Sequence, residues 1–347
     1  MNTGEGITVL SLFDGMSCGQ IALQELGVKV KAYYASEIEP SAIKTTLLNF
    51  PDTIQLGDVR NVHGADLPKI DLLIGGSPCQ GFSYCGKRLN FEDPRSVLFF
   101  EFVRVLEEVR KKNPDVLFLL ENVKMGWRHE KVITQYLGVK PVRINSALVS
   151  AQNRVRLYWT NIRTFQADMF DVPESAIPQP KDRKLTLEDI LEEEVEDRFF
   201  VSEKSLKSAL RYNERMKESG NGFGVEVHTP ASKSPCVTTK YRRRDLVIVQ
   251  RGHGFNSGGV FEGKSPTVTA SSWQHNNYVA PAILISSENL KQLVGGVRRL
   301  TPTETARLQT VPDWYRFNVN ETQIYKMLGN GWTVEVIKHI FSFIKTT

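Results

Sequence analysis

Residues Ile7–Gly19, ITVLSLFDGMSCG, join an apolar run of strand length to a turn that contains glycine. A helical pattern, Gly19–Leu26, follows this turn without a break. A strand that passes through such a turn into a helix is the first unit of an α/β sheet. Small residues in the turn let a ligand approach the backbone, and the helix start offers free N–H groups. An ordinary turn has the same local pattern, so the stretch predicts a fold before it predicts a site.

The first half of the chain repeats this alternation of apolar runs and helical patterns. We expect strands at 7–13, 31–35, 53–56, 71–75 and 116–120, and helices at 19–26, 40–50 and from Asp93-Pro94 to Lys111–Pro114. Two further runs, Arg143–Val149 and Arg156–Ile162, are expected to close the sheet as antiparallel strands. Short links between these segments indicate a mostly parallel sheet with helices on its faces. Ligands bind such sheets beyond the carboxyl ends of the strands.

The composition is that of a folded chain with more than one core. The chain has 347 residues, of which 41% are hydrophobic and 24% charged, and this argues against global disorder. No apolar run approaches the ~20 residues of a membrane-spanning helix, and Met1–Gly6 lacks the pattern of a signal peptide. We therefore expect a soluble, cytoplasmic protein. The net charge of +5 is weak support for a nucleic-acid partner.

The four cysteines, Cys18, Cys79, Cys85 and Cys236, form no C-x-x-C pair and have no histidine cluster near them. Neither a metal site nor a disulfide framework is expected from this spacing in a large cytosolic chain. Cys79 stands apart, because it lies in the loop Gly75–Ser83, GGSPCQGFS, at the end of a buried strand. There a thiol faces a cleft, and nearby helix N–H groups or an arginine would raise its thiolate fraction.

Acidic residues follow three of the expected strands. Glu37 and Asp58 come after the second and third strands, where a carboxylate can bind ribose hydroxyls or an amine. Each has a plainer interpretation, as a solvent-facing or a turn-forming residue. Glu121 comes directly after Val116–Leu120, so we expect it partly buried at the cleft, where it could act as a proton donor.

Two arginines follow an expected turn in the segment Gln152–Arg156. Alternation along an extended segment puts Gln152, Arg154 and Arg156 on one face. Two arginines on one face favour contact with an anion or with a polar base edge. A solvated strand is the alternative.

Beyond residue 165 the composition of the sequence changes. Prolines at 173, 178 and 180 and the acidic run Glu188–Asp197 precede an irregular segment, about 198–296, rich in Gly, Ser, Thr and Asn. Within it SPCVTT at 234–239 nearly repeats as SPTVTA at 265–270, which indicates two similar loop–strand units. Basic residues cluster at Lys240–Arg244 and Arg298-Arg299. These clusters either contact nucleic acid or form a charged face exposed to solvent. We expect a second domain here and helices again after Thr301.

Taken together, these segments resemble the DNA cytosine-5 methyltransferase family, in the same order from end to end. Phe13–Gly15 resembles the motif that binds S-adenosylmethionine, Ser77–Gln80 the nucleophile motif, and Glu121–Val123 and Gln152–Arg156 the motifs that hold the target cytosine. Arg299–Gln309 and Gly329–Val334 resemble the motifs that follow the recognition domain.

The turn Met16–Gly19 departs from the glycine pair of many bacterial members. Val9–Gly15, Leu98–Phe102 and Gly329–Val334 are closer to the animal de novo branch and its phage and bacterial relatives. The recognition region is longer than in those animal enzymes, so we expect a bacterial or phage enzyme.

The resemblance implies a fold, a donor and a set of partners. The fold is a Rossmann-like methyltransferase sheet, mixed and mostly parallel, with a smaller target-recognition domain. Residues 1–190 and 312–347 would form the catalytic domain, and 191–311 the recognition domain. S-adenosylmethionine would be the donor, S-adenosylhomocysteine the product, and no metal would be needed. Double-stranded DNA would be the substrate of a monomer, and a restriction endonuclease of the same host is a candidate partner.

The resemblance also implies a role for each motif residue. Cys79 would add to carbon 6 of a flipped cytosine, Glu121 would bond N3 and the exocyclic amine, Arg156 would contact O2, and Arg154 would hold the site or a phosphate. Cofactor contacts would come from Phe13, Asp14, Gly15, Met16, Glu37, Ile38, Asp58, Val59, Pro78, Leu98, Asn330 and Trp332. Contacts with DNA would come from Gln80, Ser83, Cys85, Arg242, Arg243, Arg244, Thr269, Gln274, Asn276 and Arg299.

Three alternatives stay open on the sequence. The tRNA-methylating branch of the family would carry a Cys-Phe-Thr insertion, which is not evident. A non-catalytic DNA-binding relative would have lost reactive residues, whereas Cys79, Glu121 and Arg156 are all present. An unrelated dinucleotide-dependent oxidoreductase would need a G-x-G-x-x-G after the first strand, and none occurs there.

Overall fold

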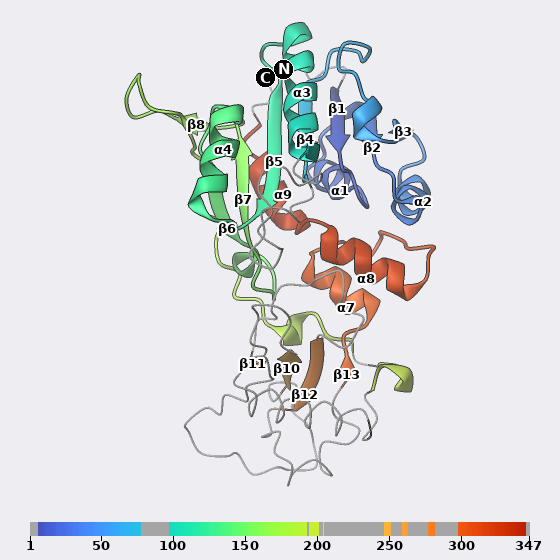
Figure 1. Cartoon of the computed structure of the whole chain (residues 1–347). Coiled ribbons are helices and arrows are strands. Elements are labelled where there is room, and N and C mark those ends of the chain that lie inside the picture. The colour runs from blue at the N-terminus through green and yellow to red at the C-terminus, as the bar shows by residue number, and fades with distance from the viewer. Residues whose placement is uncertain are drawn as a thin grey trace.

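The described residues form three β-sheets, with helices around the largest of them (Figure 1). The computed structural model describes residues 6–77, 97–192, 194–200, 204, 246–250, 259–262, 277–281 and 298–344. Figure 1 shows the four-stranded sheet at one end of the molecule, with α7 and α8 between it and the large sheet.

The large sheet has seven strands in the order β3-β2-β1-β4-β5-β7-β6. Their bounds are β1 (Ile7–Leu12), β2 (Val30–Ser36), β3 (Ile54–Gln55), β4 (Leu72–Gly75), β5 (Leu117–Val123), β6 (Val142–Asn145) and β7 (Val155–Thr160). The first five of these strands are parallel, and β7 runs antiparallel to both β5 and β6. The predicted α/β class, with its mostly parallel sheet closed by two antiparallel strands, is confirmed. Strand order reverses between β1 and β4, which is where sheets of this kind bind ligands.

Helices cover both faces of this sheet, among them α1 (Cys18–Glu25), α3 (Val97–Lys112) and α9 (Val334–Phe341). The other described helices are α2 (Pro40–Asn49), α4 (Trp127–Leu137), α7 (Pro302–Leu308) and α8 (Glu321–Asn330), and the last two lie between the large sheet and the four-stranded sheet (Figure 1). Short 3-10 turns lie at η1 (Val59–Asn61), η2 (Ser146–Leu148), η3 (Leu187–Asp189) and η4 (Asp197–Phe199). A small sheet pairs β8 (Thr164–Phe165) with β9 (Glu174–Ser175). Among the described residues, no helix has the length and apolar character needed to cross a membrane.

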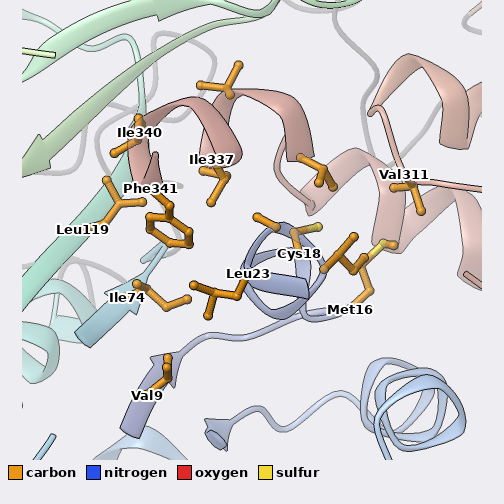
Figure 2. Close-up of a cluster of buried hydrophobic side chains, with 14 of the residues drawn as sticks. Val9, Met16, Cys18, Leu23, Ile74, Leu119, Val311, Ile337, Ile340 and Phe341 are labelled. Carbon is orange, nitrogen blue, oxygen red and sulfur yellow. The ribbon is translucent and has the colours of Figure 1, made fainter. Parts of the chain in front are cut away.

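The core lies on both sides of the large sheet because neighbouring strand residues point to opposite faces. Val9 belongs to the cluster beneath α1 and α9, and Leu10 belongs to the cluster beneath α3. Figure 2 shows α9 against the strands, with Ile340 and Phe341 near Leu119. The last described helix therefore completes the core that the first strand begins, and the C-terminal segment returns to the N-terminal half.

Two strand ends differ from the sequence prediction by three residues or more. The run predicted as a strand over Arg143–Val149 ends at Asn145, because the Asn145 side chain accepts the N–H of Ala147 and caps η2. Strand β5 continues through Val123, so Glu121 lies within the strand rather than after it. The predicted helix start at Asp93-Pro94 lies outside the described residues.

The four-stranded sheet has the order β11-β10-β12-β13. Its strands are β10 (Leu246–Gln250), β11 (Gly259–Glu262), β12 (Asn277–Pro281) and β13 (Arg298–Arg299), all antiparallel. Residues after β13 contact the other half of the chain: the side chains of Ser150 and Gln152 donate to the carbonyl of Leu308. The domain boundary near residue 311 stays a prediction.

Candidate active site

The register of the large sheet assembles the site. Leu12 of β1 lies beside Gly75 of β4, and Gly75 lies beside Leu120 of β5. Because these strands are parallel, the residues that follow them emerge at one edge of the sheet. Gly76 and Glu121 are the next residues on β4 and β5, so the start of the predicted nucleophile loop meets the predicted catalytic carboxylate at that edge.

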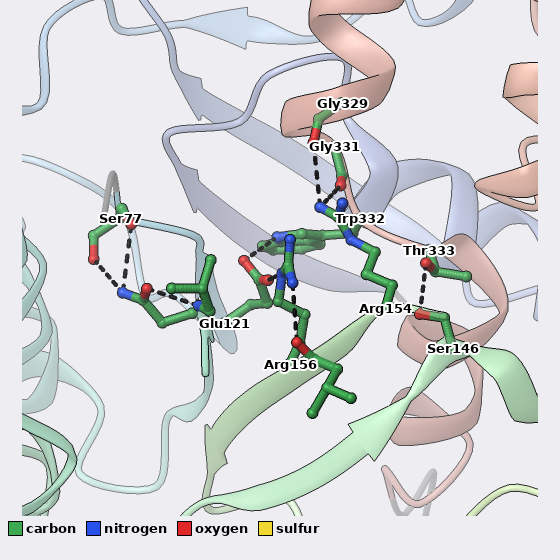
Figure 3. Close-up of polar contacts among 12 residues, drawn as sticks. Ser77, Glu121, Ser146, Arg154, Arg156, Gly329, Gly331, Trp332 and Thr333 are labelled. Atoms are coloured by element: carbon green, nitrogen blue, oxygen red, sulfur yellow. Dashed lines mark hydrogen bonds and ion pairs between the residues drawn. The ribbon is translucent and has the colours of Figure 1, made fainter. Parts of the chain in front are cut away.

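The carboxylate of Glu121 is held by two donors from different parts of the chain (Figure 3). Nε of Arg156 lies 2.9 Å from Glu121 Oε1. Nε1 of Trp332 donates to Glu121 Oε2 at 3.1 Å. Arg156 arrives from β7, where it pairs with Val123 across the strands. Both carboxylate oxygens are thus oriented, and the group is buried, where the sequence predicted partial burial.

Arg154 lies in the same strand region but has a different environment. Its side chain is buried, and Nη2 donates to the carbonyl oxygens of Gly331 at 2.8 Å and Gly329 at 3.3 Å. Burial, and next the charge of Arg156, lower the pKa of Arg154 to about 9. The sequence predicted one shared face for the two arginines, but their side chains have different partners. Arg156 contacts the carboxylate of Glu121, and Arg154 contacts the C-terminal turn.

The loop that carries Cys79 is described only at its first residues. The side chain of Asn122 donates to Ser77 Oγ at 3.3 Å, which fixes the loop start against β5. A Cβ at Gly76 would lie 2.9 Å from Trp332 Nε1 and 3.1 Å from Glu121 Oε2, so this position has no room for a side chain. Cys79 itself lies outside the described residues.

Cys18 is the one cysteine that lies within the described residues. It is buried at the start of α1, and burial raises the pKa of its thiol to about 12. A thiol with so high a pKa stays protonated at neutral pH and is a poor nucleophile. Cys85 and Cys236 lie outside the described residues.

The turn after β1 carries an unusual backbone. Phe13 has φ 57°, in the left-handed region that bulky residues rarely adopt. Such strain costs about 1–3 kcal/mol and clusters at functional sites. The N–H of Gly15 donates to Glu37 Oε2 at 2.7 Å, and the N–H groups of Ile38 and Glu39 donate to its Oε1. The two predicted cofactor segments, after β1 and after β2, are thus joined by a hydrogen bond between Gly15 and Glu37.

Asp14 brings a buried carboxylate to the same turn. Tyr33 donates its hydroxyl to Asp14 Oδ1 at 2.9 Å, while Oδ2 is buried without a hydrogen-bond partner among the described residues. Although the residue as a whole keeps some exposed surface, burial of its carboxylate raises the pKa of Asp14 to about 6, partly offset by nearby hydroxyls.

Asp58 is a third carboxylate at this edge of the sheet. It caps η1, and hydrogen bonds from the exposed Arg60 lower its pKa to about 2. With Asp14 and Glu37 it gives the ends of β1, β2 and β3 an acidic character. In this acidic rim a carboxylate can bind ribose hydroxyls or an amine, both of which the methyl donor of the predicted family carries.

The other predicted cofactor residues fall into different settings. Met16 has its side chain in the core beside α1 and α9 (Figure 2), Val59 is buried in η1, and Leu98 is half-buried on α3. Ile38 is 68% exposed beside Glu37, and Asn330 is exposed at the end of α8. Because the Met16 side chain lies in the core, Met16 can contact a ligand only through its backbone. Pro78 lies outside the described residues.

Most of the predicted DNA contacts cannot be placed. Gln80, Ser83, Cys85, Arg242, Arg243, Arg244, Thr269, Gln274 and Asn276 lie outside the described residues. The backbone of Arg299 pairs with Tyr278 between β13 and β12. The described residues contain no group of three or more His, Cys, Asp or Glu side chains placed to hold a metal.

Sequence reasoning missed the residue that joins the motifs. Gln309 Nε2 donates to the carbonyl of Leu328, and its Oε1 accepts from Gln152 and Thr333. The side chains of Thr333 and Ser146 are in turn 2.8 Å apart (Figure 3). Gln309 ends a motif that the sequence analysis quoted, but its partners lie far along the chain in both directions.

The mixed sheet, the acidic rim beyond β1 to β3 and the held carboxylate of Glu121 in β5 define an α/β enzyme of the S-adenosylmethionine-dependent methyltransferase class. The profile of the C-5 cytosine-specific DNA methylases matches residues 7–346, and the chain belongs to that family. It is therefore a DNA cytosine-5 methyltransferase, as predicted, and the family's methyl donor is S-adenosylmethionine. Membership excludes the unrelated oxidoreductase.

Relatives match over nearly the whole chain. The type II methyltransferase M1.ScrFI of Lactococcus lactis subsp. cremoris is 31% identical, covering 96% of this chain and 76% of that protein. M.HpaII of Haemophilus parainfluenzae is 32% identical, covering 97% and 88%. The orphan methyltransferase M.SPRI of Bacillus phage SPR is 28% identical, covering 96% of each.

Solved structures share the fold at lower identity. The S. pombe Dnmt2 methyltransferase superposes with a TM-score of 0.62 at 18% identity, covering 97% of this chain and 98% of that one. The Entamoeba histolytica methyltransferase EhMeth gives 0.67 at 14% identity, covering 98% of each.

Proposed function

We propose that the edge beyond β4 and β5 receives a cytosine flipped out of a specific duplex DNA sequence, with Cys79 as the covalent nucleophile. One observation carries this proposal: the paired carboxylate of Glu121 lies at Gly76, three residues before Cys79. A fixed carboxylate beside a loop that carries a thiol is what addition to a pyrimidine ring requires. A base must leave the stack to reach it, at a cost of a few kcal/mol.

Each residue has one task in the reaction. The Cys79 thiolate adds to carbon 6 of the ring, and this makes carbon 5 nucleophilic. Glu121 bonds N3 and the exocyclic amine, which stabilises the charge that builds on the ring, and Arg156 contacts O2. Bound S-adenosylmethionine supplies the methyl group. Once carbon 5 carries the methyl, loss of its proton and departure of Cys79 as thiolate restore the ring and the enzyme.

Arg154 serves this site as a positioning residue. Its guanidinium is buried against the carbonyls of Gly329 and Gly331, so it supports the turn behind Glu121. This environment favours the first of the two predicted roles, holding the site, over contact with a phosphate.

The cofactor residues share one rim. Phe13 contacts the adenine, Glu37 the ribose hydroxyls and Asp58 the adenine amine, and Asp14 belongs to the same cofactor turn. Further contacts come from Gly15, Met16 through its backbone, Ile38, Val59, Pro78, Leu98, Asn330 and Trp332. The reaction leaves S-adenosylhomocysteine and needs no metal.

The setting of the enzyme is part of the proposal. It acts as a monomer in the cytoplasm of a bacterial or phage-infected cell, and residues 191–311 contain the recognition domain. Two relatives are named type II methyltransferases and one an orphan phage methyltransferase, which supports both a restriction endonuclease partner and independent action.

Bisulfite sequencing tests this function. DNA from a host without its own cytosine methylation is sequenced after expression of the wild type or of Cys79→Ala. Methylated cytosines at one recurring sequence in the wild-type DNA, and none in the variant DNA, are expected. Unmethylated DNA from both, with methyl transfer to tRNA instead, would contradict the proposal.

A further inference from the structure

We infer that Trp332 is a positioning residue for Glu121, and that its indole N–H fixes the carboxylate in the orientation that the cytosine requires. The inference rests on the proposed role of Glu121. It adds a second role to a residue expected only at the cofactor.

The contact is specific in its geometry. Trp332 Nε1 donates to Glu121 Oε2 at 3.1 Å, while Arg156 Nε meets the other oxygen at 2.9 Å (Figure 3). A carboxylate held by one donor can still rotate about its last bond. Donors on both oxygens, one from β7 and one from the C-terminal turn, leave it a single orientation.

The turn that carries Trp332 is itself fixed by buried hydrogen bonds. Arg154 Nη2 donates to the carbonyls on both sides of Asn330, at Gly329 and Gly331. Thr333, the next residue after Trp332, bonds Ser146 and Gln309. The indole is therefore presented from a rigid support, as a residue that orients another must be.

The indole also lies close to the start of the loop that carries Cys79. A Cβ at Gly76 would lie 2.9 Å from Trp332 Nε1 and 3.1 Å from Glu121 Oε2. Gly76, the indole N–H and the carboxylate are therefore neighbours. Loss of the N–H should release Oε2 from this arrangement.

Trp332→Phe keeps an aromatic ring and removes the donor. We expect kcat for methyl transfer to fall about tenfold, the order expected for loss of a hydrogen bond to a charged acceptor. KM for DNA should stay within about twofold, because orientation of Glu121 acts on the chemical step. A rise in KM for the cofactor with kcat unchanged would assign Trp332 to the cofactor alone and overturn the inference.

Trp314→Phe is the matched control. Its indole also donates to a glutamate, Glu25 Oε1 at 2.9 Å, but on the surface at the end of α1. This variant should keep wild-type kcat. An equal loss in both variants would show a general effect of losing an indole, and would also overturn the inference.

A double-mutant cycle separates orientation from stability. In a Glu121→Gln background, Trp332→Phe should change kcat by less than about twofold, because the carboxylate to be oriented is gone. Additive losses would contradict an action through Glu121.

The hydrogen bond can also be observed without turnover. In protein labelled with ¹⁵N-tryptophan, Glu121→Gln should move the indole N–H resonance of Trp332 and leave that of Trp314 in place, whereas Glu25→Gln should do the reverse. A Trp332 resonance that ignores Glu121→Gln would refute the contact. An inactive wild type with the expected resonance shift would instead refute the proposed function alone.

Discussion

Arg156 Nε lies 2.9 Å from Glu121 Oε1, and this ion pair links β7 to β5 across the antiparallel step of the sheet. Both side chains are more than four-fifths buried, at 14% and 11% exposed. The pair is therefore shielded from solvent and placed by the backbone register rather than by a mobile loop. A cytosine that enters here meets an acceptor and a donor already separated by a fixed distance.

Glu121→Gln should slow methyl transfer at least ~10²-fold, the usual size of acid–base assistance. Gln keeps the shape of the side chain and can still accept from Arg156, so folding should be little affected. Single-turnover methyl transfer to duplex DNA measures the effect. Glu107→Gln on the exposed face of α3 is the control and should match the wild type. A loss below about tenfold at Glu121 would remove it from the chemical step.

Gly76→Ala should lower activity although the change adds one methyl group. The new Cβ would lie 2.9 Å from Trp332 Nε1 and 3.1 Å from Glu121 Oε2, so it must displace one of them. Gly126→Ala adds the same methyl where the nearest atom is 4.0 Å away, and should leave kcat unchanged. Equal kcat values for these two variants would show that the space at Gly76 does not matter.

Arg154→Met should destabilise the fold by about 2–4 kcal/mol, because two carbonyls of the C-terminal turn lose a buried, charged donor. Those carbonyls are on Gly329 and Gly331. Urea unfolding measures the change, and Arg143→Met, at an exposed arginine of the neighbouring strand β6, is the control. If both variants unfold at the same urea concentration, Arg154 does not support the C-terminal turn.

Asp14 predicts a pH dependence of stability. Its pKa in the folded state is about 6, above the ordinary 3.8, so the folded state binds the proton more tightly than the unfolded state. This contribution to stability is fully present below about pH 4 and is lost as the pH rises through about 6. Asp14→Asn cannot titrate. The free energy of unfolding of the wild type, relative to this variant, should fall by at most about 3 kcal/mol over that range.

Thermal unfolding of both proteins between pH 4 and pH 7.5 measures this difference, with Asp71→Asn as a further control. The Asp71 carboxylate accepts the N–H of Thr8 at the other end of β1. A difference between the wild type and Asp14→Asn that stays constant with pH would mean that the Asp14 carboxylate is not buried.

The sequence predicted what depends on local patterns. Alternating apolar runs predicted the parallel sheet, and the residues after the strands predicted the acidic rim and the buried Glu121. The family resemblance predicted Arg156 beside it. These features follow from short stretches, in which neighbouring residues determine one another's conformation.

Other features depend on contacts between distant segments. Trp332 and Glu121 are 211 residues apart, so no local pattern could pair them. Alternation could not tell that Arg154 turns to the carbonyl of Gly331. It also could not tell that Met16, in a predicted cofactor motif, has its side chain in the core. In each case packing between the N-terminal and C-terminal parts of the chain determines which groups the side chain contacts.

Covalent trapping on duplex DNA that contains 5-fluorocytosine tests the central claim most directly. Fluorine at carbon 5 cannot leave as a proton does, so the reaction stops with the enzyme attached to carbon 6. With S-adenosylmethionine present, we expect mass spectrometry to find the DNA on the peptide that contains Cys79, and no adduct with Cys79→Ser. An adduct on another residue, or normal turnover by the Cys79→Ser variant, would contradict the account.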